Sequence, residues 1–343
     1  MKISRLFMYG MSVLAAGGIL AGCSGNAMQP NPAGMTTTGA GSPMQTMGAT
    51  PFAAARPAMR TASGRHSDWV SPDKKKKAAL LYISDYGSNV VDFYNYTPGK
   101  IGSQAGSISS GISGPQGLCS DKKGDVYVAN TNNGQVLEYG HGSTTVKNTL
   151  TTSGEYPAGC SVSKKGDLAV TGICSNPSCG QGALLVFTKA KGTPKSYTCS
   201  NLYRYYFAAY DTKGNLYVDG ESSGGSFGLC ELPKGSSTLG NISVSSPPSF
   251  PGGVQWDGKY VSIVDQNGAK ADQYSVSGGS ATLAGSVSLN GASDIVSDTI
   301  NKGYLIGPDA GNLAVEIWAY PAGGSIVDSQ TGFGQPIGST VSI

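Results

Sequence analysis

The chain has 343 residues, of which 13% are charged and 51 are glycines, and its formal net charge is +3. A nearly neutral chain, whose one basic run is Lys74 to Lys77, lacks the electrostatic footprint of a nucleic-acid-binding protein, so we expect no nucleic-acid partner. Glycine is about twice as common as in an average protein. No long apolar stretch has a 3.6-residue period, and the composition therefore favours an all-β domain with many turns.

The first 22 residues are typical of a signal peptide. Lys2 and Arg5 supply positive charge before an apolar stretch, residues 6–20, and small residues lead to Cys23. This stretch is shorter than the roughly 20 residues that span a bilayer, and the order of the three parts predicts export. Cys23 either has a role in the processing of this signal peptide, as described next, or is a cysteine that happens to lie in an ordinary signal peptide.

The tetrapeptide Leu20-Ala21-Gly22-Cys23 resembles the lipobox of bacterial lipoproteins. This resemblance implies that Cys23 becomes a lipidated N-terminus carrying acyl chains such as palmitate, which anchor the protein in a lipid bilayer of the cell envelope. Two or three acyl chains hold a protein on a membrane where one chain barely does. Ser24 follows in place of Asp, which by the same resemblance indicates the outer membrane if the host has one.

Residues 23–67 form the expected lipidated, flexible tether. They are rich in Gly, Pro, Ser, Thr, Ala and Met and show no periodic apolar pattern. Such a segment buries too little apolar surface to offset the entropy of ordering it. The remainder, residues 68–343, is long enough for one large domain.

A repeated pattern in residues 68–343 predicts a β-propeller. Segments such as Pro115-Gln116-Gly117 and Pro157-Ala158-Gly159 each lead through a Gly-containing turn to a short apolar strand. The second strands of successive units end near residues 85, 130, 172, 220, 265 and 308, a spacing of 42 to 48 residues. That spacing fits four-stranded propeller blades.

The units resemble NHL repeats, which have a Pro-x-Gly strand, then a Gly-Asn-Leu-Tyr-Val-like strand, here residues 214–218, and then a valine-rich strand. The resemblance covers about 265 residues and is weak in the fourth and sixth units. It implies an all-β, six-bladed β-propeller with four-stranded blades, a fold also used by SMP-30-type lactonases.

The two ends of the domain predict how the ring closes. No Pro-x-Gly strand precedes Leu80, whereas the chain ends with such a strand, Pro336 to Ile343, that lacks a following partner. We expect this C-terminal strand to pair into the first blade, because closure removes exposed sheet edges. A seven-bladed ring that uses residues 60–79 as extra strands is the alternative.

Six cysteines remain after Cys23, and an even number in an exported protein indicates disulfides. A turn containing proline separates Cys174 from Cys179, which favours a local bridge. Cys119 and Cys160 fall on the inner strands of successive blades, which leaves the third pair to Cys199 and Cys230. Metal binding is the alternative, but Cys-x₄-Cys without histidine partners is weak evidence for zinc.

The sequence predicts no catalytic residues. The two histidines, His66 and His141, fall at the end of the tether and in a turn between strands. In SMP-30-type lactonases a glutamate, an asparagine and an aspartate in the channel hold a divalent ion. That triad cannot be mapped onto this chain, where Asp294 is the best single candidate. We therefore expect no cofactor, with calcium or magnesium at the channel mouth left as an alternative.

Polar residues end several second strands and are expected on one face of the ring, around the channel mouth. Capping of turns by their own side chains is the structural explanation for such residues, and a ring of ligand or cation contacts is the functional one. Aromatic residues and one arginine enter the fourth blade at this face, which is also the face of the Cys174 loop, opposite the Lys-Gly turns. The ligand-binding candidates are Asp85, Asn130, Asp219, Asp265, Asp309, Tyr203, Arg204 and Tyr205.

These features predict a cell-envelope lipoprotein with a non-catalytic propeller that binds a protein, peptide or glycan. The alternative is a divalent-metal-dependent, lactonase-like hydrolase of the SMP-30 type. Loops on a rigid scaffold concentrate binding sites, so we expect any ligand at the Cys174 loop.

Overall fold

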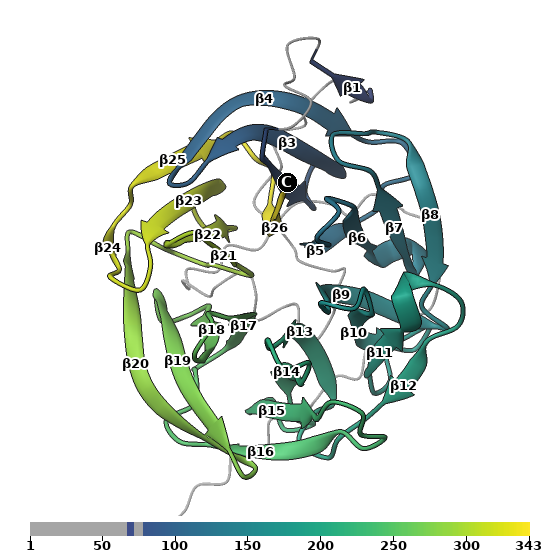
Figure 1. Ribbon diagram of the computed structural model, residues 1–343, viewed down its shortest axis with the longest axis vertical. Helices are drawn as coiled ribbons and strands as arrows, with labels where there is room; N and C mark the ends of the chain where they lie inside the picture. Colours follow the sequence, from purple (N-terminus) through teal and green to yellow (C-terminus); the bar gives the residue numbers. More distant parts are fainter. Residues whose placement is uncertain (1–66, 72–77) are drawn as a thin grey trace, which may run out of the picture. The chain divides into compact units, whose positions relative to one another are not determined.

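The computed structural model describes residues 67–71 and 78–343. These residues form strands and two single 3-10 turns, η1 (Thr131–Asn133) and η2 (Thr188–Ala190). The sheets follow one another around a common centre, with edge strands of the sheets innermost (Figure 1). Among the described residues, no helix has both the length and the apolar character needed to cross a bilayer.

Five hydrogen-bonded sheets make up this arrangement. The first has the order β1-β4-β3-β2-β26 and contains β1 (Trp69–Val70), β2 (Leu80–Asp85), β3 (Val90–Thr97), β4 (Lys100–Ile108) and β26 (Pro336–Ser342). The second contains β5 (Pro115–Ser120), β6 (Val126–Asn130), β7 (Gln135–Tyr139) and β8 (Val146–Thr151). The third contains β9 (Glu155–Val162), β10 (Leu168–Ser175), β11 (Ala183–Phe187) and β12 (Lys195–Tyr197).

The two remaining sheets complete the ring. The nine-stranded sheet contains β13 (Arg204–Tyr210), β14 (Leu216–Glu221), β15 (Phe227–Leu232), β16 (Gly240–Val244), β17 (Pro251–Trp256), β18 (Val261–Asp265), β19 (Lys270–Ser277), β20 (Ser280–Asn290) and β24 (Gly324–Ser325). The last contains β21 (Thr299–Asn301), β22 (Tyr304–Asp309), β23 (Ala314–Ala319) and β25 (Asp328–Thr331).

The sheet count corrects the expectation of six separate four-stranded blades. Strands β16 and β20, the outermost strands of the fourth and fifth repeat units, pair in parallel, with Ser243 opposite Ser280 and Val244 opposite Ala281. Two units are thereby joined into one sheet. Strand β1 is added to the edge of the first sheet by pairing with β4 and starts no further sheet.

Closure by the C-terminal strand is confirmed. Strand β26 runs antiparallel to β2 from Leu80 opposite Ser342 to Asp85 opposite Pro336. Ile337 and Val341 are buried in this position. The first sheet therefore combines the beginning and the end of the domain, and β26 supplies the innermost strand that the first unit lacked.

Apolar side chains of neighbouring sheets form the core. Tyr82 and Phe93 of the first sheet, for example, stack with ring centroids 5.0 Å apart and belong to a buried cluster that also holds Val126 and Leu137 of the second sheet. Burial of such side chains contributes about 1.5–3 kcal/mol each relative to exposure. Packing between sheets therefore positions the loops at both ends of the strands.

The Pro-x-Gly glycines allow the inner strands to approach closely near the centre of the ring. A Cβ on Gly117 of β5 would lie 2.6 Å from the carbonyl oxygen of Ala158 and 2.7 Å from Cα of Gly159, both in β9. A Cβ added to Gly159 or to Gly338 would likewise clash with the backbone of the next inner strand around the centre. Any side chain at these positions would push neighbouring inner strands apart, which explains the repeated motif.

All three predicted disulfides are confirmed. Cys119 and Cys160 join the inner strands β5 and β9 of neighbouring sheets, with Cα atoms 5.7 Å apart. Cys174–Cys179 closes a short loop between β10 and β11, and Cys199–Cys230 joins the segment before β13 to β15.

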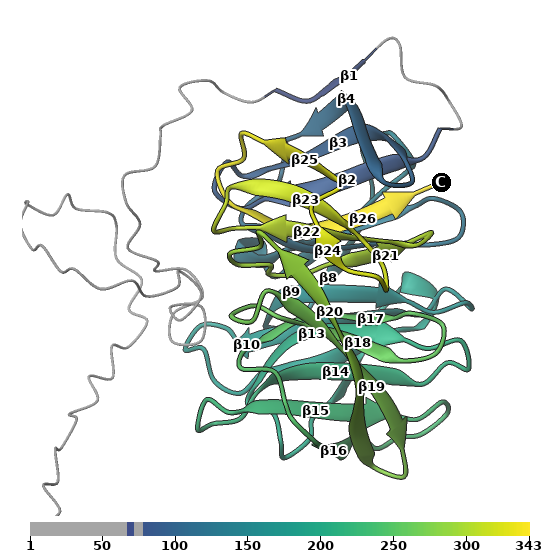
Figure 2. The same cartoon turned by 90° about the vertical axis from the view of Figure 1, so that its left-hand side faces the viewer.

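The ring has two faces, which we name by their loops. The lysine face carries the turns from the first to the second strand and from the third to the fourth strand of each unit, including residues 121–125 and 163–167. The Cys174 face carries the other connections. The edge-on view places the C-terminal end of β26 at the lysine face (Figure 2). Asp68, which accepts backbone N–H bonds from Ser109 and Ser110 at 2.6 and 2.9 Å, enters the domain at the Cys174 face.

Candidate functional site

Asp85, at the end of β2, holds the loop that leads into the closing strand. Its carboxylate accepts backbone N–H bonds from Gly334 and Gln335 at 2.7 and 2.6 Å and one from Ser88 at 3.2 Å. Gly334 and Gln335 directly precede β26. The side chain predicted to face a ligand therefore anchors backbone instead, in the manner of an Asx cap.

The same arrangement recurs around the ring. At the end of other second strands, an Asn or Asp oxygen again accepts backbone N–H bonds from residues just before an inner strand. These anchors are Asn130 with Ser113, Asp265 with Ser249 and Phe250, and Asp309 with Ser293 and Asp294. Such bonds favour a structural role over the ring of ligand or cation contacts, because the side-chain oxygens already hold backbone N–H groups.

Asp219 and Asp298 differ from these anchors, because they keep buried oxygens without a hydrogen-bond partner among the described residues. Asp219 accepts one bond, from the backbone N–H of Phe207 at 3.0 Å, while its Oδ2 is unpartnered. Both carboxylate oxygens of Asp298 are buried and unpartnered beside Gly253, whose added Cβ would lie 2.2 Å from Oδ1. Burial raises the pKa of Asp298 to about 8 and holds that of Asp219 well above its usual range.

The aromatic group predicted at the Cys174 face is also built into the scaffold. The guanidinium of Arg204 donates to the carbonyl oxygens of Cys179 and Gly180 at 2.9 and 2.8 Å and lies 4.8 Å from the ring centroid of Tyr203. Tyr205 is buried, and its hydroxyl accepts the backbone N–H of Cys199 at 2.9 Å. These contacts fix the Cys174 loop against β13. A smaller cavity of about 300 Å³ opens at this face, beside Asn201 and Phe227.

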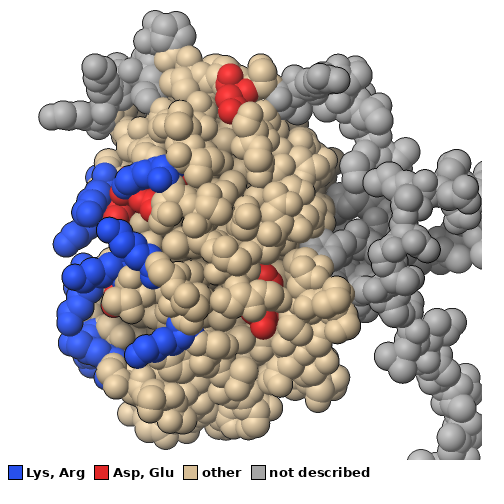
Figure 3. Space-filling model, turned by 90° about the vertical axis from the view of Figure 1, so that its right-hand side faces the viewer, with Lys and Arg blue, Asp and Glu red and all other residues tan. Residues whose placement is uncertain are grey.

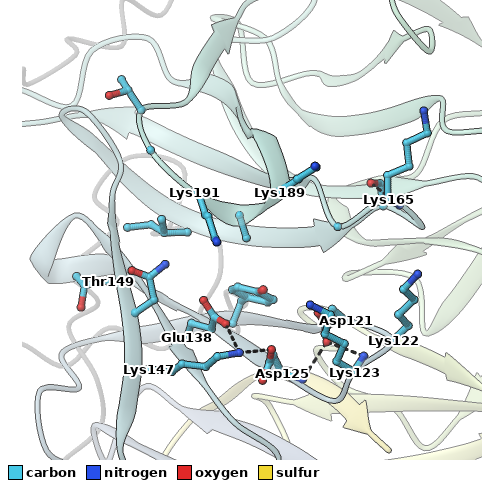
Figure 4. A pocket seen from close by; sticks show the side chains of 18 of the residues that line it. Asp121, Lys122, Lys123, Asp125, Glu138, Lys147, Thr149, Lys165, Lys189 and Lys191 are labelled. Atoms are coloured by element: carbon cyan, nitrogen blue, oxygen red, sulfur yellow. Dashed lines mark hydrogen bonds and ion pairs between the residues drawn. The ribbon is translucent and has the colours of Figure 1, made fainter.

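A larger cavity, of about 780 Å³, opens at the lysine face between the second and third sheets (Figure 4). Its walls come from the turns of both sheets, the outer strand β8 and the segment around η2. Lysines from each of these elements line it: Lys122, Lys123, Lys147, Lys164, Lys165, Lys189 and Lys191. We call these residues the lysine pocket.

Positive charge predominates in the lysine pocket, since three carboxylates accompany seven lysines: Asp121, Asp125 and Glu138. Two of these acids are paired with Lys147, whose ammonium lies 2.8 Å from Glu138 and also binds Asp125. The other six lysines are exposed, and none forms an ion pair within residues 67–71 and 78–343. On the surface, lysines gather along one side of this view of the molecule (Figure 3).

Side-chain-capped turns fix the backbone of the two Lys-Lys pairs. Oδ1 of Asp121 accepts the backbone N–H of Lys123 at 2.8 Å and that of Asp125 at 2.9 Å. Oγ of Ser163 holds Lys165 and Asp167 in the same way, at 3.2 and 3.0 Å. Asx and Ser turns of this kind mimic backbone turns. The lysine side chains therefore start from fixed positions on adjacent sheets.

Neutral hydrogen-bonding groups complete the lysine pocket. Asn148, Thr149 and Thr193 add amide and hydroxyl groups to its wall, whereas its one aromatic side chain, Tyr127, is 4% exposed. Ammonium, amide and hydroxyl groups together suit an anionic, hydroxyl-rich ligand. The sequence showed the Lys-Lys-Gly motifs, but their pairing with η2 across two sheets depends on tertiary structure.

The NHL repeat family model matches residues 113–139, which span β5 to β7. No curated protein matches the chain. A chain from the crystal structure of a nidogen/laminin complex is similar over 77% of this chain and 98% of its own length, with a TM-score of 0.64 and 12% identity.

Two proteins of unknown function are also similar in structure. One, from Desulfotomaculum acetoxidans DSM 771, has a TM-score of 0.53 and 9% identity over 78% of this chain and 99% of its own. The other, from Bacteroides caccae, has a TM-score of 0.56 and 12% identity over 78% and 99%. At such identities the likeness concerns the fold alone. The ring of sheets, these neighbours and the matched repeat together identify an all-β propeller that contains an NHL repeat.

Proposed function

We propose that this propeller is a non-catalytic binding domain whose lysine pocket holds an anionic ligand, on the face opposite the Cys174 loop where the sequence predicted one. The observation that carries the proposal is the set of six exposed lysines around one cavity of about 780 Å³, none of which forms an ion pair with another described residue. Like charges brought together without counterions repel one another, and a bound anion relieves that repulsion. A cavity of this volume lies in the range of ordinary ligand sites.

Binding of tripolyphosphate, a small multivalent anion, to the full chain tests this proposal. At low ionic strength we expect Lys165→Ser to weaken binding about fivefold, since a lysine near an anionic surface contributes about 1 kcal/mol. The matched control is Lys270→Gln, which removes one charge from the Cys174 face and leaves a side chain able to donate to Asp272. Equal affinities for the parent protein and Lys165→Ser, measured by titration calorimetry, would contradict the proposal.

We also propose that the domain is carried as a lipid-anchored lipoprotein of the cell envelope, through acyl chains on Cys23. The lipobox-like tetrapeptide and the three disulfides support this, because disulfides persist in oxidising compartments outside the cytosol. Residues 1–66, which include the signal peptide, Cys23 and all of the tether except residue 67, lie outside the described residues.

For the ring itself, we propose to count six blades. The two halves of the nine-stranded sheet, β13 to β16 and β17 to β20, are each an antiparallel set of four consecutive strands. They join through one two-residue parallel contact.

A divalent-metal-dependent, lactonase-like hydrolase is the second candidate function. The unpartnered, buried carboxylate oxygens of Asp219 and Asp298 favour it, because a buried carboxylate is otherwise costly. No group of three or more His, Cys, Asp or Glu side chains suited to a metal ion occurs in the described part of the chain. Calcium titration of the parent protein and of Asp298→Asn, followed by calorimetry, distinguishes this candidate from a purely structural role for Asp298.

A further inference from the structure

We propose that the ligand of the lysine face is a linear acidic polysaccharide that runs from the lysine pocket across the turns of four consecutive units. This inference rests on the proposed function, because it takes the lysine pocket as one end of the site. It adds the chemical class of the ligand, its polymeric nature and the path that it follows.

The capped turn that presents the pocket lysines is repeated in the next two units, outside the pocket. Oδ1 of Asp211 accepts the backbone N–H of Lys213 at 2.8 Å. Oδ1 of Asp257 accepts that of Lys259, also at 2.8 Å. In all four turns the lysine stands two residues after the capping side chain, so Lys123, Lys165, Lys213 and Lys259 occupy equivalent positions.

The four turns are neighbours in space. Each one follows an inner strand, and the inner strands β5, β9, β13 and β17 pack against one another in this order around the centre (Figure 1). The four lysines therefore form an arc on the lysine face, one step per unit. All four are exposed, and no ion pair engages them within the described ranges. A repeating row of cations matches the repeating charges of a linear polyanion.

Charge on the domain is divided between its faces. Of the lysines in the part of the chain that the structure describes, only Lys270, the first residue of β19, lies at the Cys174 face. The others lie in turns of the lysine face or at the first or second position of the strand that follows such a turn. Asp68, where the described chain begins to enter the domain, is held at the opposite face.

The chemistry of the lysine pocket favours a polysaccharide over nucleic acid. Recognition of single-stranded nucleic acid uses exposed aromatic side chains on which bases stack, whereas the pocket's one aromatic residue, Tyr127, is buried. Arginine, preferred for phosphate and base contacts, is absent from the lining of the pocket. Hydroxyl and amide groups such as those of Thr149 and Asn148 suit sugar hydroxyls instead. Uronate carboxylates then provide the regular charge.

Defined oligogalacturonates of three and of twelve units, added to the full chain, test the proposal. We expect the twelve-unit chain to bind at least tenfold more tightly than the three-unit chain, because it reaches turns beyond the pocket. The double variant Lys213→Ser/Lys259→Ser should lose most of this gain and leave the affinity for the three-unit chain unchanged. Lys165→Ser should weaken both by about fivefold, and Lys270→Gln should weaken neither. Unchanged melting temperatures show that these exposed substitutions preserve the fold.

Four outcomes overturn the proposal. If both oligomers bind equally, or if the double variant binds the long one like the parent, the site ends at the pocket, and only the proposed function stands. If a single-stranded oligodeoxynucleotide of equal charge binds more tightly, the polymer class is wrong. If neither oligogalacturonate nor tripolyphosphate binds, the proposed function fails as well.

Discussion

At the scale of single residues, Asp85 shows how one carboxylate connects distant parts of the chain. Gly334 and Gln335, whose backbone amides it binds, lie 249 and 250 positions further along the sequence. Asp85 is buried, so its removal leaves those amides without an acceptor in a place that water cannot easily reach. An unsatisfied buried donor costs about 1–3 kcal/mol.

We therefore expect Asp85→Ala to lower the free energy of unfolding by about 2–4 kcal/mol, as measured by urea denaturation. Asp85→Asn, which keeps one acceptor oxygen, should lose about half as much. Lys122→Ser, at an exposed position, serves as the control and should change the free energy by less than about 0.5 kcal/mol. Equal stabilities of Asp85→Ala and the control would show that this anchor is dispensable.

Buried acids also make stability depend on pH. Burial raises the pKa of Asp298 to about 8 and those of Glu155 and Glu316 to about 7. The folded state then binds more protons than the unfolded chain between about pH 4 and pH 8, so stability falls as the pH rises through this range. Each such group contributes at most about 1.4 kcal/mol per pH unit.

Accordingly, the urea midpoint should be lower at pH 8 than at pH 5.5, and Asp298→Asn should flatten this dependence, because an amide does not titrate. The experiment is run with a chelator, so that cations do not compensate the charge of the carboxylate. A parallel pH profile for the parent protein and the variant would contradict the assignment to Asp298.

At the scale of elements, strand β26 decides whether the ring is closed. It supplies the inner edge of the first sheet along the whole of β2. It also contacts the second unit, where the hydroxyl of Ser342 donates to the carbonyl oxygen of Gly124 at 2.6 Å and that of Ser120 donates to Val341 at 2.8 Å. Without β26, both β2 and β5 lose a neighbour.

Deletion of residues 336–343 should abolish cooperative unfolding and promote aggregation, because it exposes the edge of β2. Circular dichroism melts and light scattering measure the two effects. Removal of Ile343 alone, which is 67% exposed, is the matched control and should leave the melting curve unchanged. A truncated protein that melted like the intact chain would show that β26 is not needed for closure.

Local patterns predicted most of these strands but not every boundary. The second strands were evident because apolar runs such as Leu80 to Asp85 are bounded by turn residues. In the sixth unit the inner strand is β21, and Ile295 makes only an isolated bridge to Asp309, since tertiary packing decided where pairing began. The pairing of β16 with β20, and hence the sheet count, involves residues with no distinguishing pattern.

Prediction of the site was limited in the same way, because local sequence patterns do not show tertiary contacts. The Asx residues at strand ends were found from their positions, but only the structure shows that their oxygens hold backbone amides. The lysine pocket draws on segments from Asp121 to Thr193 that lie on two sheets. Each lysine pair can be recognised in the sequence, but the cavity that forms between the two pairs cannot.

At the scale of the whole molecule, the proposed lipidation of Cys23 decides whether the protein is bound to the membrane. Cys23→Ala should then remove the acyl chains, so the protein either moves from the membrane fraction to the soluble fraction or is not processed. The reason is that the signal peptide anchors the precursor only until it is cleaved. Membrane fractionation and mass spectrometry of the mature N-terminus measure this change. Cys174→Ser/Cys179→Ser, which removes thiols elsewhere, is the control and should leave the distribution unchanged.

The closing strand has a consequence for the order of events during synthesis. Domains begin to form as the N-terminal part of the chain emerges, yet β2 appears some 250 residues before the strand that covers its edge. Throughout that interval Leu80 to Asp85 present unpaired backbone groups that can recruit another chain. The first sheet to begin forming is the last to be completed, so a truncated or stalled chain retains an unpaired sheet edge.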